Sequence, residues 1–316
     1  MAIVAIDLGG TKLAGAILTR TGRVLQRRTT QLAGRQGRAV GDLICDEVGA
    51  LLALARAKKL VVHGIGVCVP GISRAATHKV WAPNIPGWDN YPLRAQILDS
   101  LAPRSRVPVM IDSDRACYIL GEHWQGAARG CRDAIFLAVG TGIGAGILSG
   151  GQVLRGAHDS AGAIGWLALD RPFRSAYVSC GCFEHHASGV GLAKVARELA
   201  ALRGRSSLAT GLTARDLFDA FERREPLARA VVRQAIEFWG MAVANLVSLF
   251  NPRKIIFGGG VFGPARRHLK SIYAEARKWA QPIAIRQVKL EASRLGQDAG
   301  LYGAGWLALR ANRNAD

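Results

Sequence analysis

The chain has 316 residues, of which 49% are hydrophobic and 38 are glycine, and its 42 basic against 23 acidic residues give a net charge of +19. This hydrophobic content excludes a disordered chain, and no apolar run reaches the roughly 18 residues that a membrane-spanning helix needs. The length fits one large domain or two ordinary ones.

The charge and the cysteines restrict the class of protein further. Basic residues are spread from Arg20 to Arg313 without a run of five and without interleaved aromatic residues, so we interpret them as solvated faces and expect no nucleic-acid partner. The six cysteines are scattered, and the opening "MAIVAIDLGGTK" has no basic stretch before its apolar residues. We therefore expect reduced thiols in a cytoplasmic protein without a membrane partner.

The first third of the chain reads as three strands, a helix and a further strand. Residues 2–7 and 12–18 flank the turn "LGG" as a hairpin, 22–30 form a third strand, 38–59 carry apolar residues at helical spacing, and 60–71 are a β-branched run ending in Pro-Gly. This order predicts a mixed sheet with a crossover helix.

A similar order returns in the second half. Residues 133–156 read as strand, glycine turn, strand, turn and short strand; a helical region at 213–250 opens with Thr213 as N-cap; and "NPRKIIFGGGV" adds a buried strand. We expect a duplicated topology whose two lobes pack against a shared cleft.

Three glycine-rich turns follow strands: "DLGGTK", "GTGIGAG" and "FGGGV". Such turns present backbone N–H groups to an anion, and a carboxylate beside them suits a hydrated Mg²⁺. They are either ordinary hairpin turns or phosphate sites; the second leads into a strand and so fails the dinucleotide fingerprint. The candidate nucleotide ligands are Asp7 (for Mg²⁺ through water), Gly9, Gly10, Thr11, Lys12, Gly140, Thr141, Gly142, Gly258, Gly259 and Gly260.

The segments "AIDLGGTKLAGAIL", "WAPNIPGW", "IDSDRACYILGE", "FLAVGTGIGAGIL", "GAHDSAGAIG" and "IIFGGGV" resemble the ROK family of sugar kinases and sugar-responsive repressors, from about residue 2 to residue 306. The resemblance implies a duplicated ribonuclease-H-like α/β fold of the actin–hexokinase type with mixed sheets, ATP and Mg²⁺ as cofactors, a sugar in the interlobe cleft, and a homodimer. We expect residues 1–115 to form a small lobe, on which a C-terminal helix at 301–316 packs, and residues 116–300 to form a large lobe.

The resemblance and the chemistry point to one catalytic residue. Phosphoryl transfer to a sugar hydroxyl benefits from a carboxylate within about 3 Å that accepts its proton. Asp114 matches the family's base, and Asp112 is the competing candidate. Ser113 replaces the family's preceding asparagine, and we expect both Ser113 and Asp114 to contact the sugar. Asp114 also suits a cap of the following helix. Asn84 matches an asparagine that binds a sugar hydroxyl, and Glu122 supports the helix rather than the substrate.

The stretch "CGCFEHH" at 180–186 departs from the family pattern, in which a histidine and three cysteines hold a structural zinc. Ala163 and Trp166 stand where a sugar-binding glutamate and the zinc histidine belong. Either alignment of Cys180 and Cys182 leaves at most two of four ligands; one alignment places Tyr177 at a cysteine position.

A replacement zinc site that adds His185 or His186 to these cysteines would strain to form a tetrahedron. We therefore interpret the stretch as a site that has lost its metal and kept its sugar-binding Glu184. The ring of Trp166 either fills the vacated volume or stacks on a sugar, and the two histidines are surface or packing residues.

These residues favour an ATP-dependent hexose kinase that phosphorylates a hydroxyl, by best match C6 in a glucokinase-like reaction. The alternative is a non-catalytic sugar- or nucleotide-binding regulator of the ROK type. The retained Asp7, Thr11, Asp114 and Thr141 favour the enzyme, whereas the lost polar contacts at Ser113, Ala163 and Trp166 favour the regulator.

Overall fold

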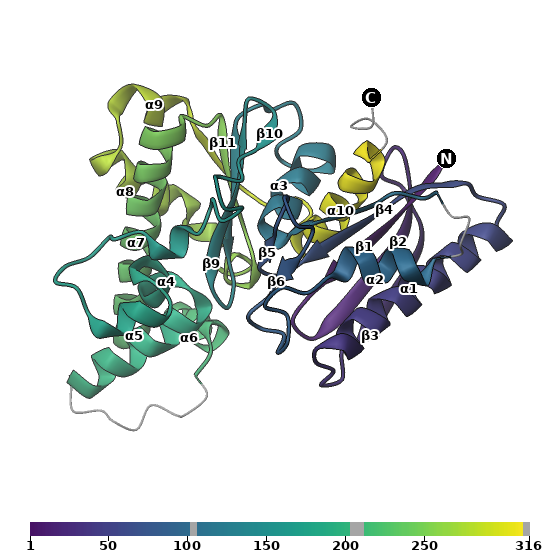
Figure 1. Ribbon diagram of the computed structural model, residues 1–316. Coiled ribbons are helices and arrows are strands. Elements are labelled where there is room, and N and C mark those ends of the chain that lie inside the picture. The colour runs from purple at the N-terminus through teal and green to yellow at the C-terminus, as the bar shows by residue number, and fades with distance from the viewer. Residues whose placement is uncertain (102–105, 203–211, 312–316) are drawn as a thin grey trace. The chain divides into compact units, whose positions relative to one another are not determined.

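The computed structural model describes residues 1–101, 106–202 and 212–311 (Figure 1). The chain divides into two compact units: Met1–Arg129, Arg155–Ala161 and Gln297–Asp316 form the first, and Gly130–Leu154 and Gly162–Gly296 form the second. Within the described ranges, no helix combines the length and the apolar character that a bilayer crossing demands.

The first unit contains a five-stranded sheet in the order β3-β2-β1-β4-β7. Strands β1, β2 and β3 are antiparallel neighbours, whereas β4 and β7 run parallel to β1. The strands are β1 (Ala2–Leu8), β2 (Lys12–Thr19), β3 (Val24–Gln31), β4 (Val62–Val69) and β7 (Val109–Ser113), with a small hairpin of β5 (Ile72–Ser73) and β6 (Val80–Trp81) beside them.

Alternation along β1 divides the residues of this sheet between two hydrophobic clusters. Val4 and Ile6 pack with the buried stripe of α1, whereas Ile3 and Ala5 pack with residues of α10 and α3. In Figure 1 the yellow α10 therefore lies beside the purple β1, although the two are at opposite ends of the sequence. The helices are α1 (Arg38–Ala57), α2 (Leu93–Ser100), α3 (Asp114–Gln125) and α10 (Ala299–Arg310).

Helix α10 approaches β4 very closely. A Cβ added to Gly66 would lie 1.8 Å from the carbonyl oxygen of Ala304, and one added to Gly64 would lie 2.4 Å from that of Ala308. Only glycine permits this backbone contact. The close packing fixes the start of α10 at the edge of the sheet where the parallel strands end.

The second unit repeats the sheet of the first, in the order β10-β9-β8-β11-β12. Again three strands form an antiparallel meander, and two more run parallel to the first strand of that meander. The strands are β8 (Ala134–Val139), β9 (Ile143–Ser149), β10 (Gln152–Val153), β11 (Lys254–Gly258) and β12 (Lys289–Ala292). The expected duplication of topology is confirmed.

Helices of the second unit bury a large apolar cluster around α7, whose Trp239 is fully buried. The helices are α4 (Cys182–Ala187), α5 (Gly189–Leu202), α6 (Ala214–Glu222), α7 (Pro226–Phe250), α8 (Leu269–Trp279) and α9 (Pro282–Gln287). Thr213 caps α6 in a reciprocal capping box with Asp216, as predicted. The helical region at 213–250 is broken where Arg224 takes a positive φ of 62° and Pro226 starts α7.

The predicted strands and the helix at 38–59 are all present, with ends shifted by a few residues. The division between the units falls elsewhere than at residue 115. Helix α3 follows that position and packs on α10, so the first unit extends to Arg129. The predicted C-terminal helix begins at Ala299, and its expected residues 312–316 lie outside the described part of the chain.

Candidate functional site

The carboxyl ends of β1, β4 and β7 place acidic residues in one row. Asp7 of β1 lies opposite Cys68 of β4, and Cys68 lies opposite Asp112 of β7. Because these strands are parallel neighbours, the residue that follows β7, Asp114, comes to the same edge. The structure thus brings together Asp7 and the Ser113–Asp114 pair that the sequence singled out.

Both candidate carboxyl groups at this edge hold their protons more tightly than usual. The pKa of Asp7 is raised to about 6, chiefly by burial and to a smaller extent by the charges of Asp114 and Asp298, while a hydrogen bond from Cys68 lowers it. Burial likewise raises the pKa of Asp114 to about 6. Two acids at one sheet edge whose pKa values are both raised by burial are typical of a site that binds a cation or moves a proton.

Ser113, and not Asp114, is the N-cap of α3. The Ser113 Oγ accepts a hydrogen bond from the backbone N–H of Ala116 at 3.3 Å. Asp114 is the first residue of the helix, and its Oδ1 accepts the N–H of Arg115 at 2.8 Å. The capping alternative for Asp114 is therefore wrong, because serine already fills that role; the second oxygen of Asp114 is not used by that bond.

Asp112, the competing candidate, is engaged in a buried ion pair. Its carboxylate is 1% exposed and accepts two hydrogen bonds from the guanidinium of Arg155, one of them 2.9 Å from Nη1 to Oδ1. It also accepts the backbone N–H of Ser113 at 2.8 Å. These contacts leave Asp112 poorly suited to accept a substrate proton, so the geometry favours Asp114.

Arg155 belongs to a segment that the sequence analysis did not single out. Arg155–Ala161 packs with the first unit, although β10 before it and the 3-10 turn Ile164–Trp166 after it belong to the second. Asp159 accepts the backbone N–H of Ala75 at 3.0 Å, and Arg115 lies 3.5 Å from the carbonyl oxygen of Ser160. No local pattern signals these contacts, since Arg155 and Asp112 are 43 positions apart.

Asn84 lies in an exposed turn after β6. The turn is closed by backbone hydrogen bonds from Ile85 N to Ala82 O and from Trp88 N to Ile85 O, and the indole of Trp88 anchors it to Gly37 O at 2.9 Å. Asn84 is thus presented to solvent on an anchored turn, and its sugar contact stays a prediction.

The second and third glycine turns lie together in the second unit. Because β8 and β11 are parallel neighbours, Gly140 and Gly259 follow them at the same edge. A Cβ added to Gly259 would lie 2.4 Å from Val139 O, and one added to Gly140 would lie 4.0 Å from Gly260 N. Thr141 is exposed at the tip of its turn. This edge resembles, in the second unit, the edge that carries Asp7 in the first.

Glu184 of α4 is bound to the second glycine turn. Its Oε2 accepts the backbone N–H of Ile143 at 2.6 Å, and burial raises the pKa of its carboxyl group. The carboxylate fills the space beside Gly142 and Gly165, where an added Cβ would lie 2.6 and 3.0 Å from Oε2. Trp166, the residue after Gly165, is 59% exposed. Its ring therefore does not fill a buried volume, and sugar stacking stays a prediction.

The donor set near "CGCFEHH" does not fit a closed tetrahedral zinc site. His185 and His186 are buried, with 2% and 3% exposure, and Nε2 of His186 lies 2.8 Å from the hydroxyl of Tyr177. Cys180 Sγ lies 3.8 Å from Ala176 O. Within residues 1–101, 106–202 and 212–311, no three His, Cys, Asp or Glu side chains gather to hold a metal. The histidines are packing rather than surface residues.

Asp7 does fit a hydrated Mg²⁺. Mg²⁺ keeps several waters and is held by one or two carboxylates together with substrate phosphates, so a dedicated cage of protein ligands is not required. Burial is the main cause of the raised pKa of Asp7, and the charges of Asp114 and Asp298 add to it; a bound cation would offset both effects.

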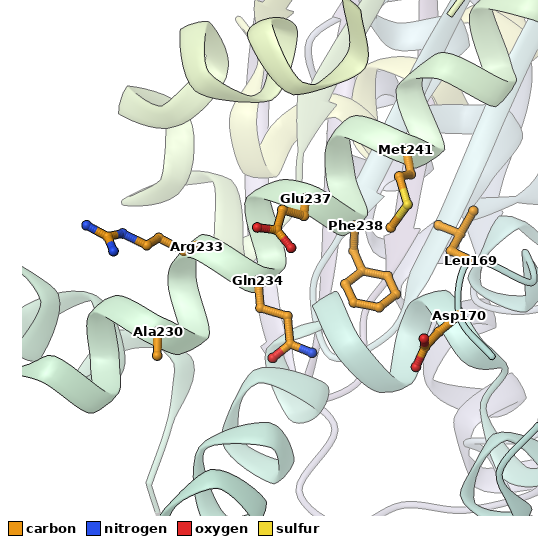
Figure 2. A pocket seen from close by; sticks show the side chains of 8 residues that line it. All are labelled: Leu169, Asp170, Ala230, Arg233, Gln234, Glu237, Phe238 and Met241. Atoms are coloured by element: carbon orange, nitrogen blue, oxygen red, sulfur yellow. The ribbon is translucent and has the colours of Figure 1, made fainter. Parts of the chain in front are cut away.

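A cavity of about 570 Å³ lies on the second unit, away from the predicted residues. Figure 2 shows its lining: six residues of α7 between Ala230 and Met241, with Leu169 and Asp170 opposite. None of the residues that the sequence analysis proposed for substrate or nucleotide lines it.

The two matching sheets, each ending in a polar or glycine-rich edge, define a duplicated ribonuclease-H-like α/β protein of the actin–hexokinase class. The sequence model of the ROK family matches residues 3–311, and the chain belongs to this family.

Relatives of known name agree with this assignment. A glucokinase of Halalkalibacterium halodurans is 33% identical over 315 residues, which cover 96% of this chain and 94% of the relative. The ROK hexokinase from Thermus thermophilus has a TM-score of 0.81 at 29% identity and covers 99% of this chain and 100% of its own. A ROK family glucokinase from Streptomyces griseus, solved with glucose and AMPPNP, has a TM-score of 0.75 at 27% identity, with 96% and 98% covered.

Proposed function

We propose that the protein is an ATP-dependent sugar kinase that transfers the γ-phosphoryl group of ATP to a hexose hydroxyl, with C6 of glucose as the first candidate. The observation that carries the proposal is the pair Asp7 and Asp114 at one sheet edge, each with a pKa near 6. The names of the relatives support the reaction class, because two of those described are glucokinases and one is a hexokinase.

Asp114 is the proposed base. Its carboxylate accepts the proton of the sugar hydroxyl while the sugar oxygen forms a bond to the γ-phosphorus and the bond to the β-phosphate oxygen breaks, which releases ADP. A base with a pKa near 6 is deprotonated at neutral pH yet basic enough to take a proton. Ser113 holds the start of α3, which sets the position of Asp114.

The remaining residues have binding roles in this proposal. Asp7 holds hydrated Mg²⁺, which when bound supplies positive charge to the phosphates; Gly9, Gly10, Thr11 and Lys12 donate hydrogen bonds to phosphate oxygens. In the second unit, the turns at Gly140–Gly142 and Gly258–Gly260 bind phosphate and border adenosine. Asn84, Glu184 and Trp166 contact the sugar. A cytoplasmic homodimer stays a prediction.

A coupled ADP-release assay over a panel of sugars tests the proposal. We expect glucose to stimulate ADP release severalfold or more above the sugar-free rate, and ³¹P and ¹H NMR of the product to show a 6-phosphate ester. Calorimetry on the same sugars provides the second arm. Sugar or ATP binding without turnover by any sugar would favour the non-catalytic regulator, to which the losses at Ser113, Ala163 and Trp166 point.

Gly300 gives a second prediction, because a Cβ at this position would lie 2.6 Å from Oδ2 of Asp7. Gly300→Ala must displace that carboxylate, and misplacement by about 1 Å costs on the order of 100-fold in rate, so we expect kcat/KM to fall by about 10- to 100-fold. The measurement is steady-state kinetics over a Mg²⁺ titration.

Gly49→Ala is the matched control for this change. It places the same methyl group on helix α1, where the added Cβ meets no atom within 4 Å. Both substitutions gain about the same helix propensity, so they differ chiefly in the contact with Asp7. Equal kinetics for the two variants would remove Asp7 from the proposed Mg²⁺ site.

A further inference from the structure

The segment at residues 167–181, which leads into α4, is held in place by one buried side chain. Its regular structure is the 3-10 turn Ser175–Ser179. Tyr177 in this turn is 4% exposed, whereas the neighbouring Phe173 and Val178 are 74% and 66% exposed. A buried tyrosine hydroxyl needs hydrogen-bond partners, and those of Tyr177 determine how the segment is attached.

The hydrogen bonds of Tyr177 have a defined direction. Its hydroxyl oxygen lies 3.0 Å from Oδ2 of Asp170 and 2.8 Å from Nε2 of His186. Because a carboxylate only accepts, the hydroxyl donates to Asp170, and Nε2–H of His186 donates to the hydroxyl. Nδ1 of His186 then accepts from the side chain of Gln234, whose nitrogen lies 3.5 Å away.

The protonation of His186 agrees with this direction. Burial lowers the pKa of His186 to about 4, so its ring is neutral at pH 7 and carries one proton, which the network places on Nε2. A zinc ion bound through Nε2 would need the lone pair of that nitrogen, which carries the donated proton here. The network and a zinc ion at Nε2 therefore exclude each other.

Ring contacts connect the same residues to three helices. His186 of α4 stacks on Phe238 of α7 with centroids 4.2 Å apart, and Tyr177 contacts His186 edge-on at 5.6 Å. Arg174 lies over the Tyr177 ring and pairs with Glu198 of α5 at 2.9 Å. Figure 2 shows Gln234 and Phe238 on α7 together with Asp170 of the segment. The segment is thus joined to α4, α5 and α7.

Helix α4 also carries Glu184, whose carboxylate accepts the N–H of Ile143 at 2.6 Å in the second glycine turn. His186 is two positions further along this six-residue helix. A change in the attachment of His186 is therefore transmitted directly to the backbone that presents Glu184.

We propose that Tyr177, Asp170 and His186 form a metal-independent clamp. The clamp holds the segment before α4, as a structural zinc holds the corresponding segment in the family pattern. Through this clamp, Tyr177 positions Glu184 for the substrate. Tyr177 stands where one alignment of that pattern has a cysteine ligand. The part that concerns sugar binding rests on the proposed function, whereas the clamp itself does not.

Tyr177→Phe removes the hydroxyl and keeps the ring, and so tests the clamp. We expect amide hydrogen exchange of residues 167–187, followed by mass spectrometry, to accelerate at least tenfold, and thermal unfolding to occur about 3 °C or more lower. Tyr273→Phe is the matched control: it removes a hydroxyl that donates to Ile285 O at 2.9 Å in the same unit. Unchanged exchange at 167–187 in Tyr177→Phe would overturn the clamp.

The metal is tested separately on the wild-type protein. We expect elemental analysis to find well below one zinc per chain and expect excess EDTA, without ATP, to leave the unfolding temperature unchanged. One zinc per chain whose removal lowers that temperature would overturn the metal-independent clamp.

The positioning role is read from the sugar kinetics. We expect Tyr177→Phe to raise the KM for the sugar by about five- to tenfold while kcat changes less than about twofold, and Tyr273→Phe to alter neither. An unchanged KM would overturn the positioning role. If the wild-type protein phosphorylates no sugar, the proposed function fails, and the exchange and zinc measurements still decide the clamp.

Discussion

Asp114→Asn is expected to lower kcat for sugar phosphorylation by about 10²- to 10⁴-fold, the range that a positioned general base contributes. The amide keeps the shape of the side chain and its hydrogen bond from Arg115 N, but it does not accept the hydroxyl proton. Sugar affinity measured by calorimetry should change only a few-fold. Asp99→Asn, an exposed change on α2 in the same unit, is the control and should retain full activity.

The pH dependence provides an independent check on the same residue. Burial raises the pKa of Asp114 to about 6, so the carboxylate becomes protonated as the pH falls through that value. Since only the ionised form accepts a proton, we expect kcat/KM to be level above pH 7 and to fall at least tenfold per pH unit well below pH 6. A level profile from pH 5 to 8, or turnover by Asp114→Asn within fivefold of wild type, would count against Asp114 as the base.

Arg155→Met is expected to destabilise the protein by about 3 kcal/mol. The substitution leaves the carboxylate of Asp112, which is 1% exposed, without its positive partner, and breaking such a pair costs about 3–5 kcal/mol. We expect the lower end of this energy range because the Arg155 side chain is 39% exposed, so that water reaches the pair. Chemical denaturation monitored by tryptophan fluorescence measures the change.

Two further variants distinguish the loss of the ion pair from a general effect of removing arginine. Arg223→Met breaks the pair of Arg223 with Glu225, in which both side chains are more than half exposed, and should cost less than about 1 kcal/mol. Asp112→Asn combined with Arg155→Met removes the stranded charge and should recover part of the loss. Equal losses in the free energy of unfolding for Arg155→Met and Arg223→Met would mean that the buried pair stabilises the protein no more than an exposed pair does.

Much of the fold was predictable from local patterns. The run at 2–7, the turn "LGG" and the run at 12–18 predict the hairpin that β1 and β2 form, because β-branched residues and glycines report burial and backbone conformation directly. The apolar spacing at 38–59 predicts α1 for the same reason. The same order of strand and glycine-turn patterns recurs in the second half of the chain, and this recurrence predicted the duplicated topology.

The placement of the candidate site was predictable only in part. A carboxylate at the end of a buried strand is visible in the sequence and marked Asp7, whereas the resemblance to the family's base selected Asp114 over Asp112. The partners of these residues could not be predicted, because neither the pairing of Asp112 with Arg155 nor the contact of Gly300 with Asp7 leaves a periodic signal. The sequence offered Asp114 as a possible cap of α3, whereas the structure gives that place to Ser113. Serine and aspartate are both good N-caps, and only the backbone decides which residue is first in the helix.

The sequence by itself determined the elements, the duplicated order, the glycine turns and the acidic residues at strand ends, because these depend on propensities and periods that act over a few neighbouring positions. The tertiary structure alone decided which charges are paired, which glycine lies against Asp7, and that Tyr177 and His186 hold the segment before α4. Those contacts join residues that are distant in the sequence and meet only in the folded chain. The free energy of a buried polar group depends on which partners it meets there.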